Sequence, residues 1–281
     1  MEGSAHRFKP RSGLGPRNGS GGLSPGHGWK SMIRRFDDPE SLSRAAADFF
    51  VQQAQAAVRD HGRFNVALAG GHTPLRTYQL LAQPPWRDRT PWSHIHVFWG
   101  DERCVAADDD RSNAGMAHRA LLCHVAVDAA HVHPIRCDAD PEAGAAHYDQ
   151  LLRTHLPAAA PVLDLVFLGL GQNGHTASLF PYSRAIDEEE RWAANVYVAE
   201  QAMHRVTLTP VILNTARIVA FLVFGGDKAQ ILSTVLEGPS DPRRLPAQII
   251  RPCTGRLIWM VDQAAACQLA HKDKVKGASG S

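Results

Sequence analysis

The feature that most constrains the fold is a run of apolar residues, 163–168, that ends directly in the glycine-containing turn 169–171. Its near-continuous apolar composition predicts a strand buried on both faces, because a strand with one face in water alternates apolar and polar residues. Helix-like segments separate several further runs of this kind. The alternation predicts an α/β protein in which helices cover both faces of a mostly parallel sheet. The other predicted strands are 64–69, 94–99, 194–198, 206–209, 218–224 and 256–261.

Helix boundaries are marked by residues that satisfy the free N–H groups of a first turn. Asp38-Pro39-Glu40 combines a capping side chain, a proline that has no N–H to lose, and an acid at the positive helix end. Gly62 can close the helix that follows. Further helices are predicted at 73–81, 112–122, 140–152 and 227–236.

The chain divides into one large unit with two extensions. Residues 1–31 are rich in Gly, Ser, Pro and Arg, so we expect a disordered leader or an added extension, with Met32 as an alternative start. A basic organelle-targeting peptide is the alternative. Residues 32–270 are predicted to form the α/β domain, and 271–281 a flexible tail.

Charge and cysteine content exclude several classes of protein. The formal net charge is only +2, which gives no electrostatic case for a nucleic acid or membrane partner. No apolar run has the length needed to span a bilayer. The five cysteines contain no C-x-x-C pair, which argues against a disulfide framework and favours a cytoplasmic location. The oligomeric state is left open, and a monomer is compatible with the sequence.

Two polar clusters follow predicted strands, where ligands bind in open α/β sheets. Gly70, Gly71 and Thr73 can cradle a phosphate at the start of a helix, although a tight turn into a capped helix explains them about equally well. Arg103 can grip a carboxylate or phosphate, with Asp101 or Glu102 orienting it. A solvated loop with an internal ion pair is the alternative for this second cluster.

The third cluster, 169–181, places His175 among small residues after the most apolar strand. A histidine there can act as a general base near neutral pH, and ester hydrolysis needs such a base to activate water. A structural loop histidine is the alternative. Two cations, Arg205 and Lys228, lie at strand boundaries, and ordinary surface exposure is their alternative explanation. The helix dipole disfavours Lys228 in a first helical turn, and a bound phosphate would offset that conflict.

No metal or cofactor is predicted. The glycine clusters match neither a Walker loop nor a dinucleotide fingerprint. The pairs His94/His96 and His131/His133 lack a third ligand at suitable spacing.

Together, the phrases ALAGGHTPL, WGDERCV, DLVFLGLGQNGHTASLFP, RVTLT and FGGDKAQIL resemble the 6-phosphogluconolactonase family over about 34–268. The resemblance implies a three-layer α/β/α sandwich and hydrolysis of a phosphorylated sugar lactone, the expected small-molecule partner, in the oxidative pentose phosphate route. It implies that His175 is the general base and that Arg103 faces the substrate. The residues then expected to contact the substrate or its phosphate are Gly70, Gly71, Thr73, Asp101, Gly171, Asn173, Gly174, Arg205 and Lys228.

The chain departs from the family pattern at two places. Asn173 stands where the family usually has Asp, so a negative charge beside His175 is missing. The segment 200–204 lacks the Lys-Pro pair that often precedes the RVTLT arginine. Two alternatives therefore stay open: a glucosamine-6-phosphate deaminase or related isomerase, and a catalytically weak sugar-phosphate-binding protein. Thr176-Ala177-Ser178 after the histidine favours the lactonase over the deaminase.

Overall fold

The structure, a computed structural model, describes residues 32–156 and 163–270. Its centre is a six-stranded sheet in the order β1-β9-β8-β5-β2-β3, and every neighbouring pair in it is parallel. A smaller antiparallel sheet has the order β4-β7-β6. The strands are β1 (Met32–Phe36), β2 (Phe64–Leu68), β3 (Ile95–Trp99), β4 (Asp101–Arg103), β5 (Leu165–Leu168), β6 (Ala193–Val198), β7 (Met203–Leu208), β8 (Ile218–Val223) and β9 (Arg256–Asp262).

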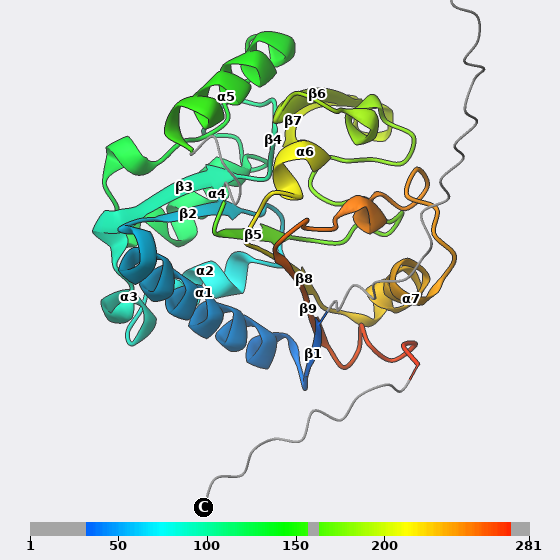
Figure 1. Ribbon diagram of the computed structural model, residues 1–281, viewed down its shortest axis with the longest axis horizontal. Coiled ribbons are helices and arrows are strands. Elements are labelled where there is room, and N and C mark those ends of the chain that lie inside the picture. Colours follow the sequence, from blue (N-terminus) through cyan, green and yellow to red (C-terminus); the bar gives the residue numbers. More distant parts are fainter. Residues whose placement is uncertain (1–31, 157–162, 271–281) are drawn as a thin grey trace, which may run out of the picture.

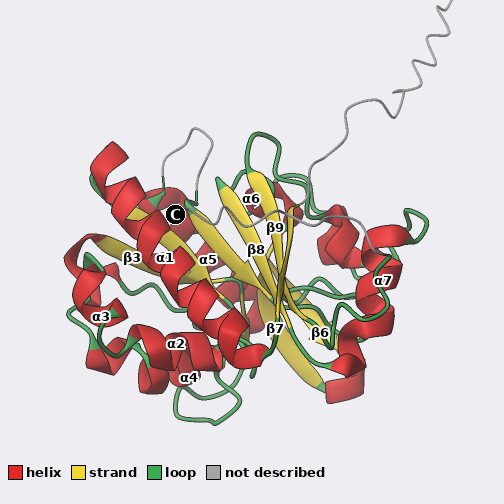
Figure 2. Ribbon diagram, turned by 90° about the horizontal axis from the view of Figure 1, so that it is seen from below, coloured by secondary structure: helices red, strands yellow, loops and turns green. Residues whose placement is uncertain are grey.

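Helices cover both sides of the central sheet (Figure 1), so the expected three-layer α/β/α arrangement is confirmed. Figure 2 shows the sheet between them, with the long helix α1 lying across its strands. The helices are α1 (Pro39–His61), α2 (Leu75–Leu81), α3 (Trp86–Arg89), α4 (Asn113–Ala120), α5 (Pro141–His155), α6 (Pro210–Leu213) and α7 (Ala229–Glu237). Short 3₁₀ helices occupy Trp92–His94, Leu122–His124, Ala129–His131, Arg184–Asp187, Ala199–Gln201, Gly226–Lys228 and Pro246–Ile249.

The local signals for strands and helix ends are confirmed. All residues of β2, β5 and β8 are buried, as their apolar composition requires. Asp38 accepts a hydrogen bond from the Ser41 amide at the start of α1, and Gly62 ends that helix in the left-handed region. Asp140 likewise caps α5.

The direction of the strand order reverses between β2 and β5. From β2 the chain moves to the edge strand β3, and it then returns to the other side of β2 to build β5, β8 and β9. At such a switch point the loops that follow the two strands diverge and leave a crevice at the carboxyl edge of the sheet. The segments that follow β2, β3 and β5 carry the first three polar clusters.

Some elements were not predicted from the sequence. The edge strand β1, which pairs with β9, contains too few apolar residues to stand out. No strand was predicted for the charged segment Asp101–Arg103, which is strand β4 because its backbone pairs with β7 in the smaller sheet.

The cysteine prediction needs a correction. Cys104 and Cys137 form a disulfide, although the cysteine spacing argued against a disulfide framework. Their sequence separation is 33, and the fold brings their Cα atoms to 4.8 Å from each other, a proximity that spacing alone cannot reveal. No helix of the described segments is long and apolar enough to cross a membrane. The predicted leader 1–31 and tail 271–281 lie outside the described residues.

Candidate active site

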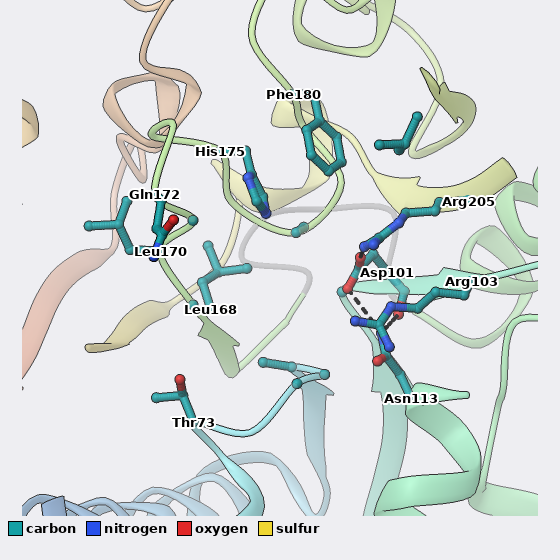
Figure 3. A pocket seen from close by; sticks show the side chains of 18 of the residues that line it. Thr73, Asp101, Arg103, Asn113, Leu168, Leu170, Gln172, His175, Phe180 and Arg205 are labelled. Atoms are coloured by element: carbon teal, nitrogen blue, oxygen red, sulfur yellow. Dashed lines mark hydrogen bonds and ion pairs between the residues drawn. The ribbon is translucent and has the colours of Figure 1, made fainter. Parts of the chain in front are cut away.

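A cavity of about 570 Å³ opens at the switch point of the central sheet. Figure 3 shows His175 and Phe180 on one side of it and Asp101, Arg103 and Arg205 on another. The structure therefore brings together side chains that are far apart in the sequence. The predicted site residues that line the cavity are Gly70, Gly71, Thr73, Asp101, Arg103, Gly171, Asn173, His175, Arg205 and Lys228.

The ring of His175 is held by close contacts on both sides. A Cβ placed on Gly171 would lie 2.1 Å from the Nδ1 and Cε1 atoms of His175, so only glycine leaves room for the ring there. Phe180 stacks on the imidazole with 4.3 Å between ring centroids. The backbone closes the loop tightly, because the Gly171 amide donates to the His175 carbonyl at 2.8 Å. These contacts fix where the imidazole lies in the cavity.

The tautomer of His175 follows from the hydrogen bonds of Asn173. Asn173 Oδ1 accepts the backbone N–H of His175 at 3.2 Å and lies 2.6 Å from His175 Nδ1. Because the same atom accepts a backbone N–H, it is the carbonyl oxygen, so a neutral ring must donate from Nδ1. The lone pair is then on Nε2, the atom that a general base needs free.

The surroundings of His175 favour its neutral form. Burial lowers the pKa of His175 to about 4, with Arg205 and Lys228 lowering it further and the Asp101 carboxylate acting in the opposite direction. The ring is therefore neutral, and able to accept a proton, over the whole physiological pH range.

Asp101 and Arg205 form a buried ion pair beside the cavity. Their exposed fractions are both 6 %, and Arg205 Nη1 lies 3.5 Å from Asp101 Oδ2. Ser178 Oγ donates to the same carboxylate at 2.5 Å, and Gln201 Oε1 accepts from Arg205 Nη2. The interpretation that Asp101 orients Arg103 is therefore wrong, because Asp101 pairs with Arg205 instead. Burial lowers the pKa of the Arg205 guanidinium, with the adjacent carboxylate opposing that shift.

Arg103 is half-buried and keeps part of its donor set free. Its Nη1 donates to the Arg111 carbonyl at 2.6 Å, whereas its buried Nε has no partner among the described residues. Glu102 does not orient the guanidinium either. Its carboxylate accepts the amides of Asn113 and Ala114 at the start of α4. Asp101 therefore pairs with Arg205, and Glu102 caps α4. Neither carboxylate occupies the guanidinium of Arg103, which can donate into the cavity.

The glycine loop and Lys228 form a further part of the lining. A Cβ on Gly70 would collide with the Asn113 side chain, and Gly71 has a φ of 81° that favours glycine. Lys228 ends the 3₁₀ helix before α7, and its Nζ lies 3.6 Å from Asp227 Oδ2. The predicted conflict between Lys228 and the helix dipole is therefore offset by Asp227, with no need for a phosphate.

Gly174 is the one predicted site residue that does not line the cavity. It has a φ of 81°, and a Cβ there would lie 2.8 Å from Leu245 Cδ2. Backbone conformation and packing thus require glycine at position 174, and the structure does not place this residue in the cavity, where the expected substrate contact would need it.

Several lining or supporting residues were not singled out from the sequence. Asn113 donates to the Asp101 carbonyl at 2.9 Å, and its own buried Oδ1 has no partner in the described part of the chain. Ser178 and Phe180 lie in the GHTASLFP phrase, which was the available signal for them. Asn113 and Gln201 carried no such signal. No group of three or more His, Cys, Asp or Glu side chains in 32–156 and 163–270 is arranged to hold a metal ion.

Fold and site together define a class: an α/β protein that presents a histidine and the cations Arg103, Arg205 and Lys228 to one cavity at the switch point of a parallel sheet. A family model described as glucosamine-6-phosphate isomerases/6-phosphogluconolactonase matches residues 37–259. The chain belongs to this family.

Named relatives agree with that assignment. The chain is 35 % identical over 245 residues to a 6-phosphogluconolactonase of Nostoc sp., covering 86 % of this chain and 99 % of the relative. It is 41 % identical over 213 residues to one of Synechocystis sp., covering 74 % and 86 %. Among solved structures, the 6-phosphogluconolactonase of Trypanosoma brucei has a TM-score of 0.76 at 30 % identity, covering 86 % of this chain and all of that one.

The contact between Gly171 and His175 yields a first prediction. Gly171→Ala should lower kcat about 10- to 100-fold, because the added methyl displaces the imidazole and a misplacement near 1 Å can cost that much. Gly226→Ala is the matched control, since a Cβ at that position meets nothing within 4 Å and Gly226 does not line the cavity. Steady-state hydrolysis of 6-phosphoglucono-δ-lactone by both variants measures the difference. Equal rates in the two variants would contradict this account of the loop.

The Asn173 contact yields a second prediction. Asn173→Asp should raise the pKa of His175 above its present value of about 4, because a carboxylate beside Nδ1 stabilises the imidazolium. Activity requires the neutral ring, so the acid limb of the pH–rate profile should move to higher pH in this variant. Profiles of kcat/KM for both proteins, corrected for spontaneous lactone opening, provide the measurement. An unchanged acid limb would mean that another group controls it.

Proposed function

We propose that this chain hydrolyses 6-phosphoglucono-δ-lactone to 6-phosphogluconate in the oxidative pentose phosphate route. The observation that carries the proposal is the orientation of His175. Asn173 holds its Nδ1–H, which leaves Nε2 as a free base in a cavity that also contains Arg103 and Lys228. Ester hydrolysis at neutral pH needs this combination of a base for water and cations for a negatively charged substrate.

In the first step His175 Nε2 accepts a proton from water while the water oxygen attacks the lactone carbonyl carbon. The carbonyl oxygen becomes an oxyanion as the tetrahedral intermediate forms. We assign its stabilisation to Arg103, because this residue lines the cavity and its guanidinium is held through Nη1 by the Arg111 carbonyl, which leaves Nη2 as a donor.

In the second step the bond between the carbonyl carbon and the ring oxygen breaks. The leaving alkoxide takes the proton held by His175, and this restores the neutral base. The product is an open-chain hydroxy acid, which ionises to a carboxylate at neutral pH. His175, oriented by Asn173, thus takes a proton from water in the first step and returns it to the leaving oxygen in the second. No further titrating group is needed.

Binding of the phosphate is assigned to cations away from the base. We propose Lys228 and Arg205 as its charged partners, with backbone and side-chain donors of Gly70, Gly71 and Thr73. Lys228 supports this assignment best, because only 21 % of its side chain is exposed and it faces the cavity with one acidic neighbour. Remote phosphate binding would position the lactone for attack. A cytoplasmic location stays a prediction.

Lys228→Ala should raise KM for 6-phosphoglucono-δ-lactone about 10- to 100-fold, the usual worth of a charge-assisted contact to a buried anion. Hydrolysis of unphosphorylated glucono-δ-lactone should change little in the same variant. Arg205 is a poorer position for this test, because its removal leaves the Asp101 carboxylate buried without a cation. The exposed Arg87, whose guanidinium pairs with Asp88, gives the matched control as Arg87→Ala. Equal losses on both lactones would show that Lys228 does not hold the phosphate.

His175→Ala should lower kcat by about 10²- to 10⁴-fold while binding of 6-phosphogluconate stays close to normal. The native rate should persist in EDTA, because the water is activated by the imidazole. Calorimetric binding of product, measured beside the lactone assay, separates loss of chemistry from loss of folding. A near-normal kcat in this variant would refute the mechanism. Release of ammonia from glucosamine 6-phosphate would favour the deaminase, and product binding by the native protein without lactone hydrolysis would favour a binding protein.

A further inference from the structure

The disulfide of this chain lies next to the proposed active site. Cys104 follows Arg103 directly at the end of β4, and its amide donates to the His204 carbonyl of β7 at 3.0 Å. Cys137 belongs to the segment that leads into α5, 33 residues further along the chain. The disulfide therefore joins that segment to the neighbour of the guanidinium to which we assign stabilisation of the oxyanion.

The Cys137 side of the disulfide is firmly anchored. Val132 forms a parallel bridge with Val97 of β3, and the His133 amide donates to the Val97 carbonyl at 2.9 Å. Cys137 itself is buried, and a Cβ on Gly144 of α5 would lie 2.6 Å from the Cys137 Cβ. Strand and helix thus hold this segment from two sides, and it can serve as a fixed support for the other cysteine.

The other side of the disulfide has weaker support. Strand β4 has three residues, and the mostly exposed segment 105–111 follows it after the cysteine. The Arg111 carbonyl at the end of this segment accepts from Arg103 Nη1 at 2.6 Å and so positions the guanidinium. Beyond that point, Glu102 accepts the Ser112 hydroxyl at 3.0 Å and secures the start of α4. The disulfide is the covalent anchor at the opposite end of the segment.

Arg103 has room to move if this anchor is lost. A cavity of about 520 Å³ is lined by both Arg103 and Cys137. Protein interiors resist displacement because neighbouring atoms fill the space around each side chain, and a side chain beside open space lacks that restraint. Opening the disulfide would therefore let segment 105–111, and with it the guanidinium, shift relative to His175.

We propose that the Cys104–Cys137 disulfide is a redox switch that fixes Arg103 when oxidised and releases it when reduced, and that it thereby controls lactone hydrolysis. The control of hydrolysis rests on the proposed function, because it acts through the position of Arg103. The oxidised chain is the active form.

A dithiol is the class of reductant that the switch requires. Its thiolate attacks the sulfur of Cys104, the less buried partner, and the Cys137 sulfur leaves and takes a proton. The second thiol of the reductant then attacks the mixed disulfide, and Cys104 leaves as a thiol. Two electrons and two protons have passed from the reductant, which ends as a disulfide.

The test equilibrates the full chain in mixtures of reduced and oxidised dithiothreitol, and alkylation with mass spectrometry measures the fraction of disulfide. On reduction, kcat for 6-phosphoglucono-δ-lactone should fall about 5- to 50-fold, since an oxyanion donor acts only when it is correctly placed. The rate should follow the disulfide fraction and recover on reoxidation. KM should change little, because the proposed phosphate partner Lys228 lies on another segment.

Variants assign the response to this pair of cysteines. Cys104→Ser/Cys137→Ser should have the low rate in every mixture. The matched control replaces the three exposed cysteines, Cys123, Cys253 and Cys267, by Ser and should respond as the native chain does. Circular dichroism of the reduced chain ensures that all rates are measured below its thermal midpoint. Failure of the oxidised chain to form the disulfide, an unchanged kcat after complete reduction, or an unresponsive control would overturn the proposal.

Amide hydrogen exchange gives a readout that needs no turnover. Segment 105–111 should exchange faster after reduction, whereas β2 and β5 should keep their protection. If the oxidised chain does not hydrolyse the lactone at all, the proposed function fails, and exchange then decides on the switch. Faster exchange in 105–111 would still support release of Arg103, and unchanged exchange would overturn it.

Discussion

The buried carboxylate of Asp101 is the contact on which the geometry of the site depends. It accepts from Ser178 of the histidine loop and from Asn113 of α4, and it pairs with Arg205 of β7. Four separate segments therefore meet at one side chain at the carboxyl edge of the central sheet. Removing one partner from such a pair leaves an uncompensated buried charge, which typically costs about 3–5 kcal/mol. The pair lies within the smaller sheet, and the Ser178 hydroxyl, which donates to the same carboxylate, joins that sheet to the loop of His175.

Elements determined by local composition could be predicted from the sequence, and elements determined by distant partners could not. The apolar run of β5 and the cap at Asp38 each carry their own signal within a few residues. Strand β4 consists of charged residues and is a strand only because β7 pairs with it. The same holds for Asn113, whose role depends on its distance to Asp101 and not on its neighbours in the chain. Thus the cavity was predictable, but the pairings inside it were not.

Two glycines of the same phrase show this limit clearly. Gly171 leaves room for the imidazole four residues later, whereas Gly174 leaves room for Leu245, which comes from a distant segment. Both were assigned to substrate binding, because their sequence contexts are alike. The Gly174 carbonyl also accepts the amide of Ala247 in the 3₁₀ helix Pro246–Ile249. The loop of His175 is therefore attached directly to that distant segment.

In the proposed complex, binding of the phosphate and proton transfer to His175 make opposite electrostatic demands on the site. Cations that attract a phosphate also lower the pKa of His175, and a base of low pKa is neutral but accepts protons weakly. Asn173 orients the ring of His175, but its neutral amide adds no negative charge that would raise the pKa of the imidazole in the free protein. A phosphate bound as proposed would carry that charge itself. Its dianion beside Lys228 and Arg205 would offset the two cations and raise the pKa of the imidazole. The proposed substrate would therefore strengthen the base on binding, and this makes the neutral residue at position 173 compatible with the proposed mechanism.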